Sequence, residues 1–275
     1  MDKMPDLVDR TALARNRARA EPDALFLQEA VAGELQERLI EVNRTFKSIA
    51  IVTGFPDFWA ARYPDATIVA DDDALALEPA AHDLILHCMC LHWANDPVGQ
   101  LVQCRHTLKP DGLLLCAFLG GQTLHELRAS LAEAEAAITG GLSPRIAPMG
   151  EIRDLGGLLQ RAGFALPVAD AAPLTASYAN AFHLMHDLRK MGENNALTDR
   201  IKHPTRRNVL TEAASIYSAS FGNEDGRVNA TFEIITLTGW APSDTQQQPL
   251  RPGSATARLA DALGTTETPL DRSKD

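Results

Sequence analysis

The sequence has no long apolar run and little positive charge. None of its apolar stretches approaches the roughly 20 residues of a membrane-spanning helix, and its N-terminus lacks the apolar core of a signal peptide. Lys and Arg number 26 against 36 Asp and Glu, which gives a formal net charge of −10 at pH 7. Nucleic acid and anionic lipid are bound by clustered positive charge. We therefore expect a cytoplasmic protein with no membrane span and no nucleic-acid partner.

The one basic cluster of the sequence lies near the N-terminus. It consists of Arg10, Arg15, Arg17 and Arg19. Such a cluster is usually the solvated face of a helix. The alternative is a docking patch for an acidic partner.

Cysteine is scarce, and its few copies lie in one apolar window: Cys88, Cys90, Cys104 and Cys116. This placement indicates reduced thiols inside a sheet rather than a disulfide framework. The C-x-C spacing predicts that Cys88 and Cys90 share one face of a strand. The window lacks the second closely spaced pair that structural zinc sites use, so we predict no metal site.

Motifs of several enzyme classes are missing as well. The sequence contains no P-loop, no H-E-x-x-H and no C-x-x-C, and no Ser/His/Asp arrangement has local motif support. These absences disfavour a kinase, a metalloprotease and a hydrolase.

Short apolar runs separated by turns and helices begin at Ile49. The runs "SIAIVTG", "ATIVAD", "HDLILHCMC" and "GLLLCAFLG" are rich in Ile, Leu and Val. Strands of a parallel sheet covered by helices on both faces have this character. The pattern predicts an α/β fold with a Rossmann-like, doubly wound sheet.

Four parts follow one another along the chain. Residues 1–47 have helical periodicity and predict an N-terminal helical cap, and residues 48–170 are expected to form the Rossmann-like core. Residues 171–241 contain two helical patterns and a long alternating run, which predict lid helices and a final strand. Residues 242–275 are rich in Pro, Gln, Thr and Ser, and we expect a loose C-terminal tail.

Two local signals mark the ends of helices. The turn "KPDG" follows a helical pattern, and we expect Gly112 to supply its positive φ. Thr123 and Glu126 have the spacing of a capping box and predict the start of a helix.

The stretch "SIAIVTGFP" looks like the first strand of a nucleotide-binding sheet and its ligand loop. It offers one glycine, Gly54, where such loops usually have two or three. The sequence therefore raises the question of whether this loop is a cofactor site or the remnant of one.

Longer blocks of the sequence resemble a known family. The blocks are "DLILHCMCLHWANDPVGQLVQCRHTLKPDGLLLCAFLGGQTLHELRASL", "SPRIAPMGEIRDLGGLLQRAGFALP", "LMHDLRKMGENNAL", "GRVNATFEI" and "LTGWAPSDTQQQPLRPGSA". They are similar to the class I S-adenosylmethionine (SAM) dependent methyltransferases over roughly residues 8–258. Within that superfamily they resemble the malonyl carrier-protein methyltransferase of biotin synthesis and the methyltransferase-like assembly factor of respiratory complex I, a family known for hydroxylating an arginine.

The resemblance implies a SAM site at the carboxyl ends of the first strands. Aligned on Gly54, the sequence has Ala50, Val52 and Pro56 where the family has an acid and two further glycines. The residues expected at the cofactor are Gly54, Asp71, Asp72, Ala74, His87, His92 and Trp93. Those expected at a substrate or partner are Tyr178, Arg189 and Asn194.

The chain is too short between its early strands for the usual fold. Only the twelve residues 71–82 separate "ATIVA" from the next strand, and a parallel crossover needs about a dozen or more. One βα unit is therefore expected to be missing. "ATIVADDD" is either the second strand, in which case Asp71 is the ribose-binding carboxylate, or the third, which "VADDDALALEP" resembles more closely and which leaves that carboxylate absent.

Several of these residues have an ordinary structural interpretation as well. Asp71, Asp72 and Asp73 are either a solvated loop or a ligand site, since like charges raise one another's pKa and favour a bound partner. Arg189 suits a carboxylate or a peptide, or else forms a surface salt bridge with Asp187 or Glu193. Tyr178 and Glu233 carry weaker predictions.

Two functional hypotheses follow. The first is a SAM-dependent transferase of the biotin-pathway and complex I assembly branches, acting on a protein substrate. The second is a pseudoenzyme that binds or assembles another protein without using SAM. Under the second hypothesis the cleft beside Gly54 is filled by Phe55, Phe58 and Trp59, and Pro56 removes a backbone donor.

Overall fold

The computed structural model describes residues 6–246 and 259–266. Residues 1–243 form one compact unit and residues 244–275 a second, in which the structure describes the short helix α9 (Leu259–Leu263). Much of the predicted loose tail, residues 242–275, lies outside the described residues. Within the described part of the chain, no helix combines the length and the apolar character needed to cross a membrane.

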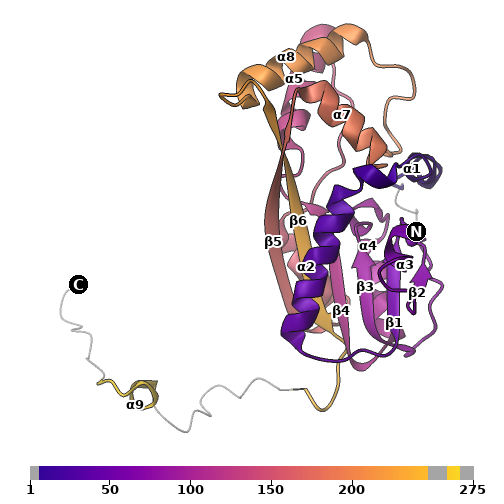
Figure 1. Cartoon of the computed structure of the whole chain (residues 1–275), viewed down its shortest axis with the longest axis vertical. Coiled ribbons are helices and arrows are strands. Elements are labelled where there is room, and N and C mark those ends of the chain that lie inside the picture. The colour runs from indigo at the N-terminus through magenta and orange to yellow at the C-terminus, as the bar shows by residue number, and fades with distance from the viewer. Residues whose placement is uncertain (1–5, 247–258, 267–275) are drawn as a thin grey trace. The chain divides into compact units, whose positions relative to one another are not determined.

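A six-stranded sheet organises the first unit, in the order β2-β1-β3-β4-β6-β5 (Figure 1). The strands are β1 (Ile49–Thr53), β2 (Thr67–Val69), β3 (His82–Cys88), β4 (Leu108–Gly120), β5 (Ala165–Tyr178) and β6 (Val228–Trp240). Strands β1 to β4 are parallel, and β6 runs antiparallel to β4 and β5. The predicted α/β sheet that lacks one βα unit is confirmed.

Strand β2 pairs directly with β1, with Ala50 opposite Thr67. In a doubly wound sheet the second strand lies beside the first, so β2 holds the second strand's place. Since a third strand would also lie beside β1 if the second were missing, the correspondence of "ATIVADDD" to the second or the third strand stays a prediction. The chain returns from β2 to β3 through the loop 70–81, which contains no helix, because so short a segment has no room for one.

Helices cover both faces of the sheet. One face carries α2 (Phe26–Val42), which lies across the strands in Figure 1, together with α3 (Pro56–Ala60). The other face carries α4 (Pro97–Thr107) and α6 (Ile152–Arg161). The side chains of β1 alternate between the two layers, with Ile51 in the first core and Ala50 and Val52 in the second, as the period of a strand requires.

The long antiparallel strands β5 and β6 extend beyond the parallel strands, and a second group of helices lies at their far end (Figure 1). These helices are α5 (His125–Thr139), α7 (Ala181–Lys190) and α8 (Arg207–Phe221). The N-terminal helix α1 (Arg10–Arg17) lies at the same end of the sheet, toward which β1 and β2 point. The predicted N-terminal helices and the two late helices are thus present.

Two local predictions are wrong for steric reasons. In the turn after α4, the positive φ of 61° belongs to Asp111 and not to Gly112. A Cβ at Gly112 would meet the Leu108 side chain and the Lys109 carbonyl, so this glycine permits a close approach instead. No capping box forms at α5, because Thr123 donates to the Gly120 carbonyl while Glu126 bonds Thr231.

The four cysteines are free and buried, as predicted. Cys88 and Cys90, however, do not share a face. Met89 between them has a φ of 52° and ends the strand, so Cys88 packs in one core and Cys90 in the other.

The central strand should dominate stability. Leu86 on β3 is fully buried, so the Leu86→Ala variant leaves a cavity and should lower the free energy of unfolding by about 2 to 5 kcal/mol. Ile40→Ala is the control, because Ile40 is 68% exposed and should change stability by less than about 0.5 kcal/mol. Urea unfolding measures both, and equal losses would contradict the packing described above.

Candidate functional site

The topological switch point of the sheet lies between β1 and β3. From β1 the chain passes to β2 on one side and then to β3 on the other. Ligands of open α/β sheets bind outside the carboxyl ends of the strands at such a point. Gly54 directly follows β1 at this place, and Asp71 follows β2.

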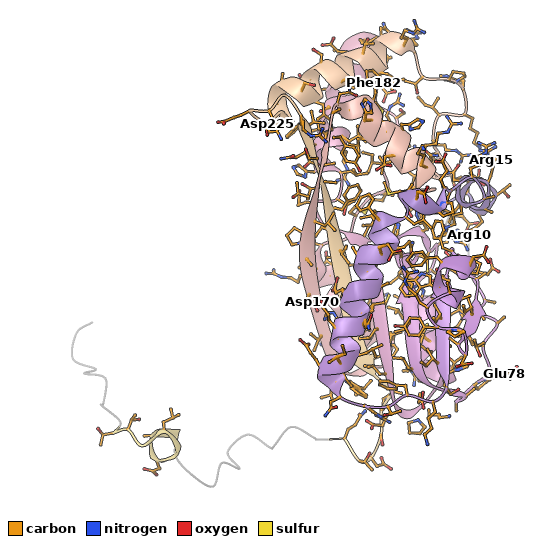
Figure 2. All side chains as sticks on the ribbon, viewed as in Figure 1. Arg10, Arg15, Glu78, Asp170, Phe182 and Asp225 are labelled. Atoms are coloured by element: carbon orange, nitrogen blue, oxygen red, sulfur yellow. The ribbon has the colours of Figure 1, made fainter. Side chains whose placement is uncertain are left out.

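The guanidinium of Arg17 fills this place. Its Nη1 donates to Asp71 Oδ1 at 2.7 Å and its Nη2 donates to Asp71 Oδ2 at 3.1 Å. Arg10 adds a 3.4 Å contact from its Nη1 to Oδ2. Figure 2 labels Arg10 on α1 and, nearer the other end of the parallel strands, Glu78 in the loop that leads from β2 to β3.

Gly54 allows this arrangement. A Cβ on Gly54 would overlap the guanidinium carbon and nitrogens of Arg17. The single glycine of the loop therefore serves a side chain of the same protein. A cavity of about 250 Å³ remains beside it, lined by Arg10, Leu13, Ala14, Arg17, Thr53, Gly54, Pro56, Ile68, Val69, Ala70, Asp71 and Asp72.

The aromatic residues after Gly54 are not the main filling of this cleft. Trp59 is fully buried, and its indole N–H donates to Gln28 on α2 at 3.0 Å. Phe58 packs on the Arg62 guanidinium. Phe55 lies nearest, with its ring centre 6.0 Å from the Arg17 guanidinium carbon. The expectation that these rings fill the cleft is therefore wrong, because an arginine side chain takes the space.

The Arg17–Asp71 ion pair is buried, and each of its two groups shifts the pKa of the other. The Arg17 side chain is 10% exposed and the Asp71 side chain 3%. Burial raises the pKa of the Asp71 carboxyl, but the charge and hydrogen bonds of Arg17 outweigh it, and the pKa lies below its usual value. Arg17 Nε is buried and has no hydrogen-bond partner among the described residues, a defect that costs about 1 to 3 kcal/mol.

SAM does not fit the place as these residues are arranged. A ribose at this point bonds the carboxylate that ends the second strand, and both oxygens of Asp71 are engaged by arginine. The approach beside Gly54 is taken by the same guanidinium.

The other residues expected at the cofactor lie in different surroundings. Asp72 and Ala74 are exposed in the loop after β2, and Arg10 Nη2 approaches Asp72 Oδ1 at 3.6 Å. His87 is fully buried on the face of the sheet that α4 covers, with its Nε2 3.1 Å from Gln100 Oε1. Burial lowers the pKa of His87 to about 4.

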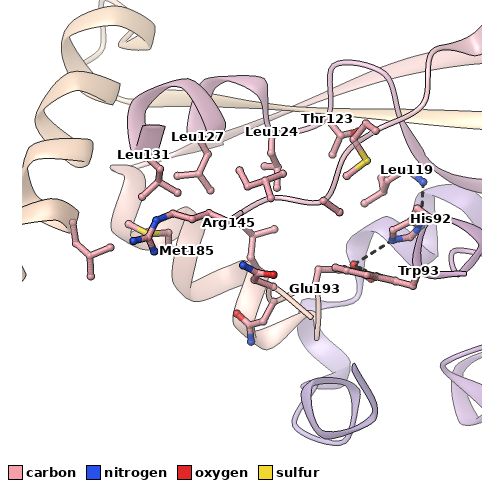
Figure 3. A pocket seen from close by; sticks show the side chains of 17 residues that line it. His92, Trp93, Leu119, Thr123, Leu124, Leu127, Leu131, Arg145, Met185 and Glu193 are labelled. Carbon is pink, nitrogen blue, oxygen red and sulfur yellow. Dashed lines mark hydrogen bonds and ion pairs between the residues drawn. The ribbon is translucent and has the colours of Figure 1, made fainter. Parts of the chain in front are cut away.

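His92 and Trp93 lie in a second cavity of about 280 Å³ (Figure 3). They belong to the short helix η2 (Leu91–Trp93) that follows β3. The cavity has apolar walls from β4, α5, α7, α8 and the loop before α6. The apolar residues are Leu119, Leu124, Leu127, Leu131, Ile146, Ala147, Met149, Met185, Leu188 and Leu210.

Glu193 is a buried carboxylate in the wall of this cavity. Its Oε2 accepts from the Trp93 indole N–H at 2.8 Å and lies 3.3 Å from His92 Nε2. The other ring nitrogen of His92 accepts from the Leu119 amide at 3.4 Å, which leaves Nε2 to donate to Glu193. Burial raises the pKa of Glu193, but these contacts outweigh it and hold the pKa below its usual value.

Two polar groups of the cavity are not engaged within the described part of the chain: one carboxylate oxygen, which accepts, and one side-chain amide, which both donates and accepts. Glu193 Oε1 and the side-chain amide of Asn194 make no hydrogen bond with any residue that the structure describes. Arg145 also lines the cavity, but it is paired with Glu135 at 2.6 Å and donates to Thr205. Its charge is therefore compensated, while Glu193 keeps one carboxylate oxygen, Oε1, that accepts no hydrogen bond from the described residues.

Of the residues expected at a substrate, Asn194 lines the cavity and two others do not. Tyr178, at the end of β5, donates to Asp187 at 2.9 Å. Arg189 is exposed on α7 and forms no ion pair within the described part of the chain. The same part holds no group of three or more His, Cys, Asp or Glu placed to bind a metal.

Arg17 and Glu193 were not singled out as ligand residues from the sequence. For Arg17 a signal existed, because Arg10 and Arg17 are seven residues apart and so share one face of a helix. The three consecutive aspartates 71–73 are an acidic segment that such a basic helix face can pair with. For Glu193 the sequence offers no comparable signal.

Comparisons with known proteins found a family model, a solved structure and several sequence relatives that are similar to this chain. A methyltransferase domain model matches residues 24–116. A putative methyltransferase of known structure from Bacillus halodurans has a TM-score of 0.48 and 15% identity, covering 75% of this chain and 98% of that one.

The sequence relatives are more informative. The mouse "Arginine-hydroxylase NDUFAF5, mitochondrial" is 34% identical over 277 residues, which cover 90% of this chain and 80% of that protein. The zebrafish protein of the same name is 41% identical over 198 residues, 72% of this chain and 61% of the relative. A malonyl-[acyl-carrier protein] O-methyltransferase from Xylella fastidiosa is 34% identical over 66% of this chain and 59% of that protein.

These relatives confirm the resemblance to the methyltransferase superfamily and to both of its branches. They also correct one prediction. The mouse and zebrafish relatives are named as mitochondrial, which overturns the expected cytoplasmic location.

Buried His87 should make stability depend on pH. The folded protein holds this ring neutral down to a pKa of about 4, whereas the unfolded chain takes up the proton below about 6.5. The free energy of unfolding should therefore fall as the pH falls from 6.5 to 4. The fall should reach about 3 kcal/mol, because each unit of difference in pKa corresponds to about 1.4 kcal/mol. His87→Gln should flatten this decline in urea unfolding, whereas His106→Gln, at an exposed position, should keep it. An unchanged slope in His87→Gln would contradict the assignment.

Proposed function

Because the chain belongs to the family of the NDUFAF5 arginine hydroxylases, we propose that it recognises an arginine side chain of a protein partner. The observation that carries this proposal is the carboxylate of Glu193 in the wall of the apolar cavity. A carboxylate buried this deeply is costly without a positive partner. The nearest partners, His92 and Trp93, use only its Oε2.

The walls of the cavity support a long side chain with a charged end. Leucines of α5 and α7 and Met185 offer apolar surface to an aliphatic stem, and stems of this kind bury well while their heads find polar partners. The head would meet Glu193 Oε1 and the amide of Asn194. A guanidinium has five donors in a fixed plane and suits two acceptors better than an ammonium does.

A protein substrate or assembly partner is the class of ligand that the family supports. Relatives from mouse, human and zebrafish are named arginine hydroxylases. The resemblance to the complex I assembly branch adds that the arginine belongs to a protein under assembly.

A non-catalytic binding role is the second candidate. It is favoured by Arg17, which engages the carboxylate that a bound SAM would need. Both candidates use the Glu193 cavity, and they differ in whether the arginine is altered. Mass spectrometry of a bound partner distinguishes them, because a hydroxylase or methyltransferase leaves a mass gain on the arginine and a binding factor leaves none.

The Glu193→Gln variant tests arginine recognition. Acetyl-arginine methylamide should shift the Trp93 indole N–H resonance of the unaltered protein, because that N–H donates to Glu193. Loss of a hydrogen bond to a charged group costs about 1.5 to 3 kcal/mol, so Glu193→Gln should weaken binding by about 10-fold or more. The uncharged acetyl-citrulline methylamide should bind the unaltered protein as weakly as the arginine probe binds Glu193→Gln.

The matched control is Glu212→Gln, the same chemical change at an exposed position of α8. It should bind the arginine probe as the unaltered protein does. Equal affinities of Glu193→Gln and Glu212→Gln for the arginine probe would overturn the proposal.

A further inference from the structure

The place at the ends of β1 and β2 is occupied by the protein itself. The sheet order puts a ligand site there, and the methyltransferase domain match covers it. We propose that Arg17 is an internal occupant of the SAM place and that the folded protein excludes SAM until α1 releases it. This inference goes beyond the arginine recognition proposed for the Glu193 cavity and does not rest on it.

The contacts of Arg17 are those that a ribose-bearing ligand would need. The Asp71 carboxylate accepts from both terminal nitrogens of Arg17, so neither oxygen is left for a pair of ribose hydroxyls. The surface of Gly54, where a ligand could approach the backbone, lies against the same guanidinium. Removing the Arg17 side chain uncovers Gly54 and frees Asp71 Oδ1, leaves Oδ2 with its 3.4 Å contact to Arg10, and enlarges the adjoining cavity of about 250 Å³.

Helix α1 is held firmly enough to keep Arg17 in place. Asp9 caps α1 through the Ala12 amide and pairs with Arg200 at 2.9 Å. The Val8 amide donates to Asn95 at 2.8 Å, so the chain before α1 is tied to the loop after η2. A ligand that competes with Arg17 therefore works against several contacts besides the ion pair.

These contacts also connect α1 to the segment that carries Glu193. Asn16 donates to the Asn194 carbonyl at 3.2 Å, and the Asp9 amide donates to the Ala196 carbonyl at 2.8 Å. A Cβ on Gly192 would lie 3.1 Å from the Cα of Arg17. Arg17 in its place on Asp71 and the wall of the Glu193 cavity thus belong to one connected arrangement.

The test is SAM binding by calorimetry to the full chain and to two Arg17 variants. The unaltered protein should show no binding up to millimolar SAM. Arg17→Ala should bind SAM at least 10-fold more tightly than the unaltered protein does. Arg17→Gln keeps an amide to bond Asp71 but is shorter, and it carries the test if Arg17→Ala does not fold by near-UV circular dichroism.

The control is Arg19→Ala, because Arg19 is an exposed arginine just beyond α1. It should behave as the unaltered protein. Two results would overturn the proposal: SAM binding to the unaltered protein as tight as to the Arg17 variants, or no binding to either folded variant. Binding of the arginine probe to the Glu193 cavity is a separate experiment. A negative result for SAM binding therefore does not bear on the proposed arginine recognition.

Discussion

The ion pair between Arg17 and Asp71 explains three features of the sequence together. The basic cluster on α1, the run of aspartates after β2 and the single glycine after β1 meet at one point at the end of the sheet. A buried carboxylate needs a partner, and removal of that partner is strongly destabilising. Arg17 thereby fixes α1 on the sheet, and Gly54 gives the guanidinium its space.

The function proposed for the chain follows from what this pair leaves open. With the end of β2 engaged by α1, the cavity around Glu193 keeps a carboxylate oxygen, Oε1, that accepts no hydrogen bond from the described residues. Its apolar walls come largely from the helices α5, α7 and α8, and its polar edge comes from the loop that α1 contacts. A family whose relatives are named for arginine chemistry is consistent with a site that selects a guanidinium.

The strands, their parallel order and the missing βα unit could be predicted, because apolar runs and chain length are local properties of the sequence. The occupant of the cleft could not, because Arg17 and Asp71 lie 54 residues apart and nothing local links them. Glu193 was hidden for the same reason, since its donor Trp93 is 100 residues away. The left-handed position at Asp111 was misassigned to Gly112 because both residue types tolerate that conformation, and only the packing around Leu108 separates them.

A double-mutant cycle on Arg17 and Asp71 tests the central interaction most directly. Arg17→Met, Asp71→Asn and the double variant would be compared with the unaltered protein by urea unfolding at neutral pH. Each single change leaves a buried charge without its partner. We therefore predict a coupling free energy of about 3 kcal/mol between the two sites. If the two single losses in the free energy of unfolding add up to the loss of the double variant to within about 0.5 kcal/mol, the side chains act independently. That result would contradict an ion pair on which the position of α1 depends.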